Sequence, residues 1–163
     1  MVASAWPEPV ERVAAFLRRT GVDARVEEFD GGTPTAVEAA AAVGCGLSQI
    51  VKSLLFLCDG RPVLVMVPGD RRADARKVAA AAGAAKAKIA DAAEVERATG
   101  FAPGGVAPFP LHDVSAVLME RTLLGHGAVW FGAGSSSHMA SVAPTDLVRL
   151  TGARTVDVVQ ERT

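Results

Sequence analysis

Three stretches of this chain carry residue types that could do chemistry, and the first is a lysine inside an apolar run. Lys52 lies in Ile50–Cys58, where Ser53 is the one other residue that is not apolar. Removing an ammonium group from water is costly unless the group is paired or lines a cleft. Lys52 is therefore predicted either to line a cleft or to extend its tip to water from the start of a strand.

The second stretch, residues 99–110, combines glycines and prolines with apolar residues and has no charge. A rigid loop with bare backbone can bring main-chain N–H groups close to a ligand. Such donors can stabilise an oxyanion without any side-chain nucleophile. The same composition is also typical of a structural turn that leads into a strand, and composition alone favours that turn.

The third stretch is a run of small residues, 132–138, which is predicted to be a turn and ends at His138. A histidine there could orient a water molecule or take a proton. The pattern alone favours a turn histidine that is exposed to solvent. The sequence has no nucleophile elbow, P-loop or dinucleotide fingerprint. Its histidines and its two cysteines lack metal-ligand spacing, so we expect neither a metal nor a cofactor.

Length and composition indicate one folded domain over residues 1–163, because half of the residues are apolar. No apolar run reaches membrane-spanning length, and the start of the chain lacks the features of a secretory signal. We therefore expect a cytoplasmic protein with no membrane contact and with reduced thiols at Cys45 and Cys58. The net charge of −1 argues against a protein that coats nucleic acid. A basic window, Arg71–Lys88, is predicted either to contact phosphates or to be a solvated helix face.

These stretches must be positioned by short helices and strands, which follow one another along the chain in an irregular order. Capping pairs such as Thr35 with Glu38 and Asp91 with Glu94 mark two of the helix starts. Asp59-Gly60 predicts a hairpin between two apolar strands. Helices are predicted over 9–19, 35–43, 74–82, 91–98 and 144–150, and strands over 22–29, 50–58, 63–67, 114–119, 128–131, 139–142 and 155–159. This order predicts an α/β (α+β) domain with a curved mixed sheet flanked by short helices.

Four segments in a fixed order resemble the YbaK/prolyl-tRNA-synthetase-associated editing domain family. The resemblance covers nearly the whole chain. The segments are QIVKSLLF at 49–56, VMVPGD at 65–70, TGF at 99–101 with GGVAPF at 104–109, and GAGS at 132–135 followed by APTDL at 143–147.

The resemblance implies a deacylase that removes a wrong amino acid from the acceptor end of tRNA and works apart from a synthetase, although a synthetase is a conceivable partner. It implies a small amino acid such as alanine or cysteine, conceivably on proline tRNA. It also implies a single α/β domain with a curved mixed sheet and no metal.

The resemblance also implies site residues. Lys52 matches the strand lysine that lies near the terminal adenosine and the ester. Gly104 and Pro108 match the G-x-x-x-P loop, whose backbone, with Gly105, holds the ester carbonyl. Substrate-binding positions in the pocket wall are implied at Gly134, Ser135 and Phe29, and His138 is a candidate for catalysis.

This chain departs from the family pattern at several positions. Members that act on cysteinyl-tRNA usually have a glycine where this chain has Pro110, and some have a tyrosine at Phe29. Their late turn is often basic, whereas here it reads SSSHM over 135–139. In having a histidine in that turn, the chain is similar to members that remove alanine or other small residues. Two other functions are also compatible with the sequence: a non-catalytic module that binds a tRNA end or an aminoacyl-nucleotide, and a hydrolase of another small ester.

Overall fold

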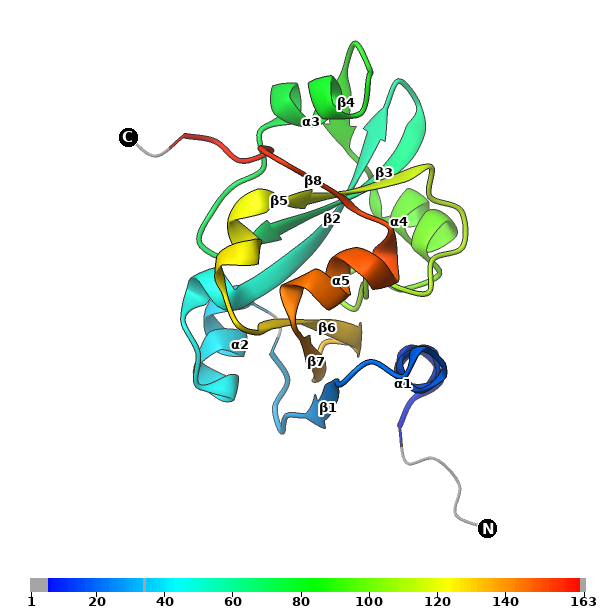
Figure 1. The fold of residues 1–163 in the computed structure, drawn as a ribbon. Helices are drawn as coiled ribbons and strands as arrows, with labels where there is room; N and C mark the ends of the chain where they lie inside the picture. Colours follow the sequence, from blue (N-terminus) through cyan, green and yellow to red (C-terminus); the bar gives the residue numbers. More distant parts are fainter. Residues whose placement is uncertain (1–5, 34, 162–163) are drawn as a thin grey trace.

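A mixed β-sheet with helices on both faces forms the protein (Figure 1). The computed structural model describes residues 6–33 and 35–161. The order along the sheet is β1-β7-β6-β2-β3-β5-β8, with β4 paired to β2. The strands are β1 (Arg25–Glu28), β2 (Ile50–Cys58), β3 (Arg61–Pro68), β4 (Ala87–Ile89), β5 (Ala116–Glu120), β6 (Val129–Ser135), β7 (His138–Val142) and β8 (Arg154–Val156). The predicted mixed α/β fold is confirmed.

The β2–β3 hairpin forms the centre of the sheet. The two strands pair antiparallel from Val51 opposite Pro68 to Cys58 opposite Arg61. Asp59 and Gly60 both have positive φ, at 50° and 81°, which is the geometry that an Asp-Gly hairpin turn requires. On either side the sheet becomes parallel, because β6 pairs with β2 and β5 pairs with β3 in that sense.

The helices begin and end within one residue of the predicted bounds. They are α1 (Glu8–Thr20), α2 (Ala36–Val43), α3 (Ala75–Ala81), α4 (Ala92–Thr99) and α5 (Pro144–Thr151), with 3-10 turns η1 (Leu47–Gln49) and η2 (Arg121–Gly125). Thr35 accepts a hydrogen bond from the Glu38 N–H, and Asp91 accepts one from the Glu94 N–H. Side-chain caps of this kind satisfy N–H groups that have no partner inside the helix.

Apolar clusters fill both faces of the sheet. On one face, residues of α1, α4 and α5 pack on Leu55, Leu64 and Phe131. On the other face, α3 packs over Phe56 and its neighbours, while α2 covers a smaller cluster. Phe101 and Phe109 belong to the first cluster although they lie in the 99–110 loop. Two aromatic side chains thus anchor this loop in the core and hold it at a fixed place beside the sheet.

The predicted turn over 132–138 is wrong. Strand β6 continues to Ser135 and β7 begins at His138, so the turn consists of Ser136 and Ser137 alone. The small residues meet a different requirement: a Cβ on Gly132 would lie 3.3 Å from the carbonyl oxygen of Val106. Small residues here permit close backbone approach within a strand, which composition alone does not distinguish from a turn.

Two further expectations need correction. His138, expected in solvent, is only 2% exposed and lies at the start of β7. The strand expected over 22–29 is limited to Arg25–Glu28, where β1 pairs with β7 at the edge of the sheet. Near the C-terminal end, β8 stops at Val156, and Val159 forms an isolated bridge with Ala73.

Candidate functional site

A cavity of about 200 Å³ lies at the N-terminal end of β2 and gathers residues from distant parts of the chain. Of the residues that the sequence predicted for a site, Lys52, Gly104, Ser135 and His138 line it. The other lining residues come from the start of α2, from β2, and from the β6–β7 hairpin with the facing loop; they are Thr33, Thr35, Ala36, Ala39, Ile50, Val51, Ser53, Val106, Gly132, Ser136 and Met139. The walls are thus largely small or apolar, with a few polar groups among them.

Lys52 is half-buried in the cavity wall, and its ammonium is partnered. The Nζ atom donates a hydrogen bond of 2.9 Å to the carbonyl oxygen of Arg71. Burial lowers the pKa of Lys52 below its ordinary value; the nearby charge of Arg72 lowers it further, and Asp70 acts in the opposite direction. A cation that is partly desolvated and bound to a backbone carbonyl has further N–H donors for a ligand.

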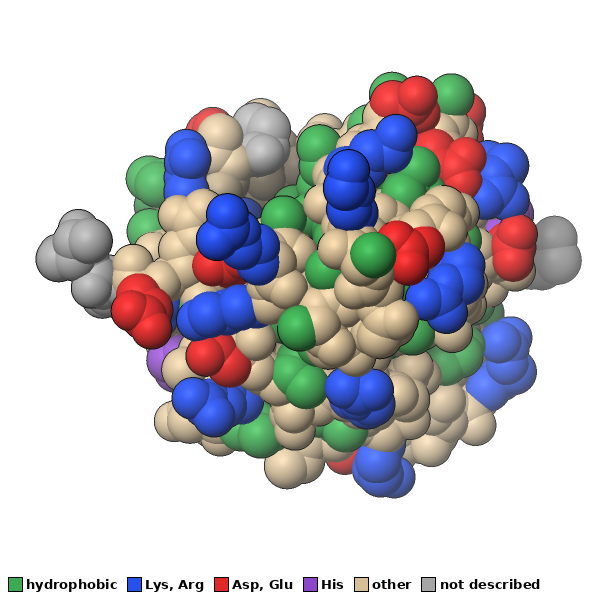
Figure 2. All heavy atoms as spheres, turned by 90° about the horizontal axis from the view of Figure 1, so that it is seen from above, with side chains coloured by type: hydrophobic (Ala, Val, Ile, Leu, Met, Phe, Trp, Pro, Cys, Tyr) green, Lys and Arg blue, Asp and Glu red, His purple; other side chains and the backbone are tan. Residues whose placement is uncertain are grey.

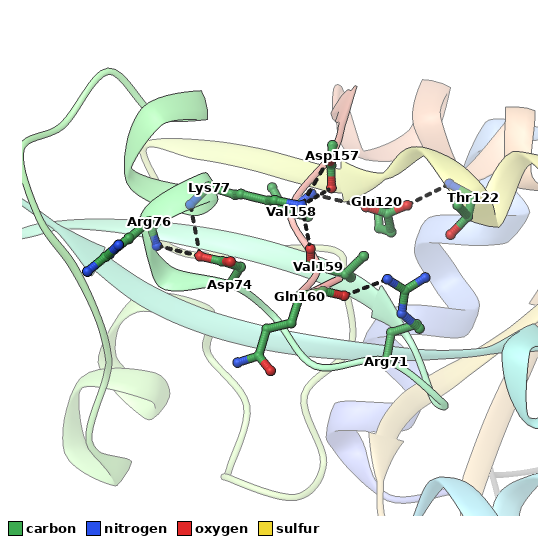
Figure 3. A network of polar contacts seen from close by, with 10 residues as sticks. All are labelled: Arg71, Asp74, Arg76, Lys77, Glu120, Thr122, Asp157, Val158, Val159 and Gln160. Carbon is green, nitrogen blue, oxygen red and sulfur yellow. Dashed lines mark hydrogen bonds and ion pairs between the residues drawn. The ribbon is translucent and has the colours of Figure 1, made fainter. Parts of the chain in front are cut away.

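A polar network fixes the segment that carries the Arg71 carbonyl (Figure 3). Arg71 donates to the carbonyl oxygen of Gln160, and the Gln160 N–H donates to the carbonyl oxygen of Arg72. The Asp74 N–H donates to the carbonyl oxygen of Val158. The segment after β8 therefore runs beside residues 71–74 and holds them in place.

The same network is anchored from both sides by charged side chains (Figure 3). Lys77 of α3 donates to both carboxylate oxygens of Asp157, each at 3.1 Å, and to the carbonyl oxygen of Val159. Buried Glu120, at the end of β5, accepts from the N–H groups of Thr122 and Val158. The position of Lys52 thus depends, through Arg71, on residues more than 100 positions away in the sequence.

The loop over 99–110 contributes backbone to the cavity at Gly104, whose φ of +85° is one that glycine adopts without strain. The loop is held from behind as well. Arg12 of α1 donates to the carbonyl oxygen of Gly100 at 2.7 Å and lies over the ring of Phe101. A loop fixed by core aromatics and by α1 can present its backbone in one geometry.

Ser135 and His138 form a short contact between polar side chains in the cavity wall. The Ser135 Oγ lies 2.6 Å from the His138 Nδ1 and also accepts a hydrogen bond from the Ser137 N–H. The His138 Nε2 faces the Oε2 of Glu28 at 3.6 Å. The Ser53 Oγ and the His138 Nε2 are buried and have no hydrogen-bond partner among the described residues. Polar atoms left in this state beside a cavity are typical of a site that receives a ligand or water.

Four residues that the resemblance implied do not line this cavity. Gly134 packs under α1, since a Cβ there would meet the backbone of Pro9 at 2.8 Å. A Cβ on Gly105 would lie 3.1 Å from the carbonyl oxygen of Gly134, so the absence of a side chain at Gly105 allows the loop to approach β6. Pro108 is buried and lines a separate hollow. Phe29 packs edge-to-face on Trp130.

Sequence reasoning missed several lining residues. Thr35 was interpreted as a helix cap only, although its position at the start of α2 also places it at the cavity. One sequence feature could have identified Ser53, because it is the second residue of its strand that is not apolar. No local sequence feature identifies Glu28, because only the pairing of β1 with β7 brings it to His138.

A second, wider hollow with a basic rim lies beyond the far end of β2. It has a volume of about 680 Å³ and is lined by residues of the β2–β3 turn, α3 and β4, including Arg76, Lys86 and Lys88. All three basic residues are exposed. Figure 2 looks onto the molecule from the side of α3 and β4 and shows Lys and Arg side chains spread over this face, with acidic ones between them.

Within residues 6–33 and 35–161, no group of three or more His, Cys, Asp or Glu side chains is arranged to hold a metal ion. Cys58 is buried, Cys45 is partly buried, and both are free thiols. None of the helices in the described part of the chain is long and apolar enough to cross a membrane.

Residues 30–150 match the family model of the aminoacyl-tRNA editing domain. The chain is 34% identical over 139 residues to a proline--tRNA ligase of Nitratidesulfovibrio vulgaris (strain DP4), a match that covers 85% of this chain and 24% of the ligase. The chain thus spans about a quarter of the length of that relative. It is 32% identical over 123 residues to the uncharacterized protein YwhH of Bacillus subtilis (strain 168), covering 75% of this chain and 78% of YwhH.

Two solved structures superpose over nearly all of the chain. One is described as a candidate trans-editing enzyme for prolyl tRNA synthetase; it has a TM-score of 0.89 and 34% identity, and the match covers 96% of this chain and 100% of that one. The other, the hypothetical protein APE2540, has a TM-score of 0.85 and 32% identity, with coverage of 91% and 99%.

Proposed function

This chain belongs to the aminoacyl-tRNA editing domain family, and from that premise we propose that it is a deacylase that hydrolyses the ester bond of a mischarged aminoacyl-tRNA. The observation that carries the proposal is the cavity, where Lys52, the Gly104 backbone and Ser135 meet within about 200 Å³. An ester that is already activated needs positioning and charge stabilisation more than it needs a strong protein nucleophile.

Lys52 and Gly104 have separate roles in this proposal. The Lys52 ammonium contacts the terminal nucleotide of the tRNA near the ester. This contact either replaces the hydrogen bond to the Arg71 carbonyl or forms in addition to it. The backbone at Gly104 polarises the ester carbonyl as negative charge develops on its oxygen. One such donor is typically worth about 3 kcal/mol of transition-state stabilisation. The nucleophile is a bound water or a hydroxyl of the substrate ribose.

The size and lining of the cavity support a small amino acid as the group removed. Ala36, Ala39, Ile50 and Met139 form apolar walls around a space of about 200 Å³. A pocket of this kind excludes larger residues by size, which is how editing sites spare correctly charged tRNA. We propose alanine ahead of cysteine, because His138 and its serine neighbours replace the basic turn of cysteine-specific members.

Proline tRNA is the proposed carrier. The relatives include proline--tRNA ligases, and one structural neighbour is described as a candidate trans-editing enzyme for prolyl tRNA synthetase. The proposal is that this chain acts on the acceptor end after release of the tRNA from the synthetase, with the synthetase as a transient partner.

The remaining predicted residues are proposed to shape the site from behind. Gly105 lets the loop approach β6, and Gly134 lets β6 approach the start of α1; a side chain at either position would push these elements apart. Pro108 fixes the direction of the loop from a buried position, and Phe29 supports α2 through Trp130.

The basic hollow is proposed to hold the tRNA backbone. Cys58 lies six residue steps along β2 from Lys52, a span of roughly 20 Å at about 3.3 Å per step. A tRNA with its terminal ester beside Lys52 would extend several nucleotides before it reached Arg76, Lys86 and Lys88. In a hydrolase of small esters, the substrate would not reach this basic surface.

A panel of mischarged tRNAs tests the proposal. Purified protein is incubated with proline tRNA carrying alanine, cysteine, serine or proline, and release of each amino acid is followed over time. The expected result is fast release of alanine, slower release of cysteine and none of proline. Tight binding without release would favour the non-catalytic module, and hydrolysis of small amino-acid esters with no preference for tRNA would favour the alternative hydrolase.

A further inference from the structure

Three neighbouring strands place Glu28, His138 and Ser135 in one row across the sheet. Glu28 of β1 pairs directly with His138 of β7, and His138 pairs with Ser135 of β6. Residues directly opposite each other on paired strands project from the same face, so the three side chains are neighbours by register. One end of the row, Ser135, lies at the cavity, and the other end, Glu28, is exposed at the sheet edge.

One tautomer of His138 gives this row a continuous order of donors and acceptors. The Ser135 Oγ accepts from the Ser137 N–H at 3.1 Å, so its own proton is available to the His138 Nδ1 at 2.6 Å. A neutral imidazole that accepts at Nδ1 carries its proton on Nε2. That Nε2 faces the carboxylate of Glu28 at 3.6 Å. The row thus has the order hydroxyl, imidazole, carboxylate.

The imidazole is enclosed, so its chemistry reaches the cavity through Ser135. His138 is 2% exposed, and the ring of Trp6 contacts it edge-on with centroids 5.9 Å apart. The charged groups around it are Glu28 from β1 and, in the lining of the same cavity, Lys52 from β2. A hydroxyl, a base within hydrogen-bond reach and a third group beside the base are the signature of an activated oxygen.

We propose that Ser135, His138 and Glu28 form a proton relay for the hydrolytic water, with Ser135 as the group that contacts the water and Glu28 as a positioning residue. This inference rests on the proposed deacylase function. It assigns to Glu28 a role that depends entirely on its pairing with His138.

The atoms balance as follows. The water oxygen bonds to the ester carbonyl carbon while one water proton passes to the Ser135 Oγ and the Ser135 proton passes to the His138 Nδ1. The Glu28 carboxylate stabilises the imidazolium formed. When the bond between the carbonyl carbon and the ribose oxygen breaks, the proton returns through Ser135 to that ribose oxygen. The products are the free amino acid and the tRNA hydroxyl, and the relay is restored.

The test compares Glu28→Gln with Glu27→Gln in the full chain. Glu27 is the next residue of β1, is paired with Met139 and projects to the opposite face, so its variant is a matched control. Both variants and Ser135→Ala are assayed with proline tRNA that carries alanine. The values of kcat and KM are measured separately, and thermal unfolding midpoints are recorded.

The relay predicts that Ser135→Ala lowers kcat about 100-fold and Glu28→Gln about 10-fold, both with little change in KM. Glu27→Gln should match the wild type in both kcat and KM. Glu28 is exposed, so its variant tests the relay even where Ser135→Ala fails to fold.

Three results would overturn the relay while leaving the deacylase function of the wild type intact. The first is a full kcat in Ser135→Ala, and the second is a Glu28→Gln variant that behaves like Glu27→Gln. The third is an aminoacyl group bound covalently to Ser135, detected by mass spectrometry of the intact protein. A folded wild type that releases no amino acid from any mischarged tRNA is a different outcome. It would overturn the proposed function and the relay together.

Discussion

The ammonium of Lys52 is bound to the carbonyl oxygen of Arg71 at 2.9 Å, and the segment that carries Arg71 is held by the end of the chain. Residues of the described C-terminal stretch therefore help to set where the cavity cation lies, although none of them lines the cavity (Figure 3). This arrangement gives the site a cation whose position is fixed by backbone rather than by a carboxylate, so that its charge is not neutralised by its partner.

Replacing Lys52 with methionine should remove activity and preserve the fold. Methionine keeps a long apolar stem in a wall that is already largely apolar, and it lacks the charge that contacts the substrate. We expect kcat/KM for a mischarged tRNA to fall about 100-fold, with an unfolding midpoint close to that of the wild type. Arg19→Met, which removes an exposed cation from α1, is the control and should retain activity. Near-normal turnover by Lys52→Met would show that the site is assigned wrongly.

The alkaline side of the pH–rate profile should respond to the neighbours of Lys52. Burial and Arg72 lower the pKa of Lys52, and Asp70 raises it. The ammonium is lost as the pH rises through this lowered pKa, so activity should decline at a lower pH than an ordinary lysine would give. Arg72→Gln removes the charge that lowers the pKa and should move the decline to higher pH, whereas Asp70→Asn should move it to lower pH.

Rates for this experiment are measured after subtracting spontaneous ester hydrolysis, which increases with pH. The two substitutions are predicted to act in opposite directions, which separates titration of Lys52 from a general loss of stability. A shift of both variants in the same direction would mean that another group controls the alkaline limb.

Local signals in the sequence predicted the central hairpin and the helix boundaries correctly. Asp59-Gly60 specifies its turn through backbone conformations that few other pairs adopt, and Thr35 and Asp91 cap helices within three residues of themselves. Lys52 could be singled out because a charge in an apolar strand conflicts with the cost of burial. Each of these inferences depends on residues that are close together in the sequence.

The relationship between Glu28 and His138 could not be predicted in this way. It depends on the register of β1 against β7, two strands separated by more than 100 residues. A shift of one residue would turn Glu28 to the opposite face and put Glu27 in its place. The run of glycine and serine before His138 also concealed a strand, because small residues serve turns and close strand packing equally well.

Reversing charges at the basic hollow should weaken tRNA recognition selectively. Arg76→Glu with Lys88→Glu places two carboxylates where the tRNA phosphates are proposed to lie. We expect KM for aminoacyl-tRNA to increase at least 10-fold, with a weaker salt dependence of binding because fewer counterions are released. Hydrolysis of a small alanyl ester, if measurable, should be unchanged.

The matched control is Arg18→Glu with Arg19→Glu, which reverses two exposed charges on α1, at the other end of the molecule from α3 (Figure 1). An equal effect of both double variants would indicate that net charge, rather than the basic hollow, governs tRNA affinity.

Substituting alanine for Gly134 should destabilise the fold. Gly134 has a φ of +105°, and an added Cβ would lie 2.8 Å from the backbone of Pro9, which cannot move without displacing α1. Strain and displacement together should cost at least about 2 kcal/mol, which corresponds to a decrease of roughly 5 °C or more in the unfolding midpoint. Gly125→Ala has open space and an unstrained φ, so its midpoint should stay near that of the wild type.

Buried Glu120 offers a test of the link between the C-terminal segment and the cavity. One carboxylate oxygen accepts from the Val158 N–H at 3.0 Å and the other from the Thr122 N–H at 2.9 Å, and the residue is 1% exposed. In Glu120→Gln, an NH₂ group would face one of these N–H donors, leaving it without an acceptor in a buried position. Such a loss costs about 1–3 kcal/mol, so the unfolding midpoint should fall by roughly 2–10 °C. The exposed residue Glu96 on α4 supplies the control variant, Glu96→Gln.

The same variant should also affect activity, because the segment loosened in Glu120→Gln holds Arg71, whose carbonyl binds Lys52. We expect kcat/KM to decrease in Glu120→Gln at temperatures well below its unfolding midpoint. An unchanged kcat/KM there would mean that Lys52 keeps its position without the C-terminal segment.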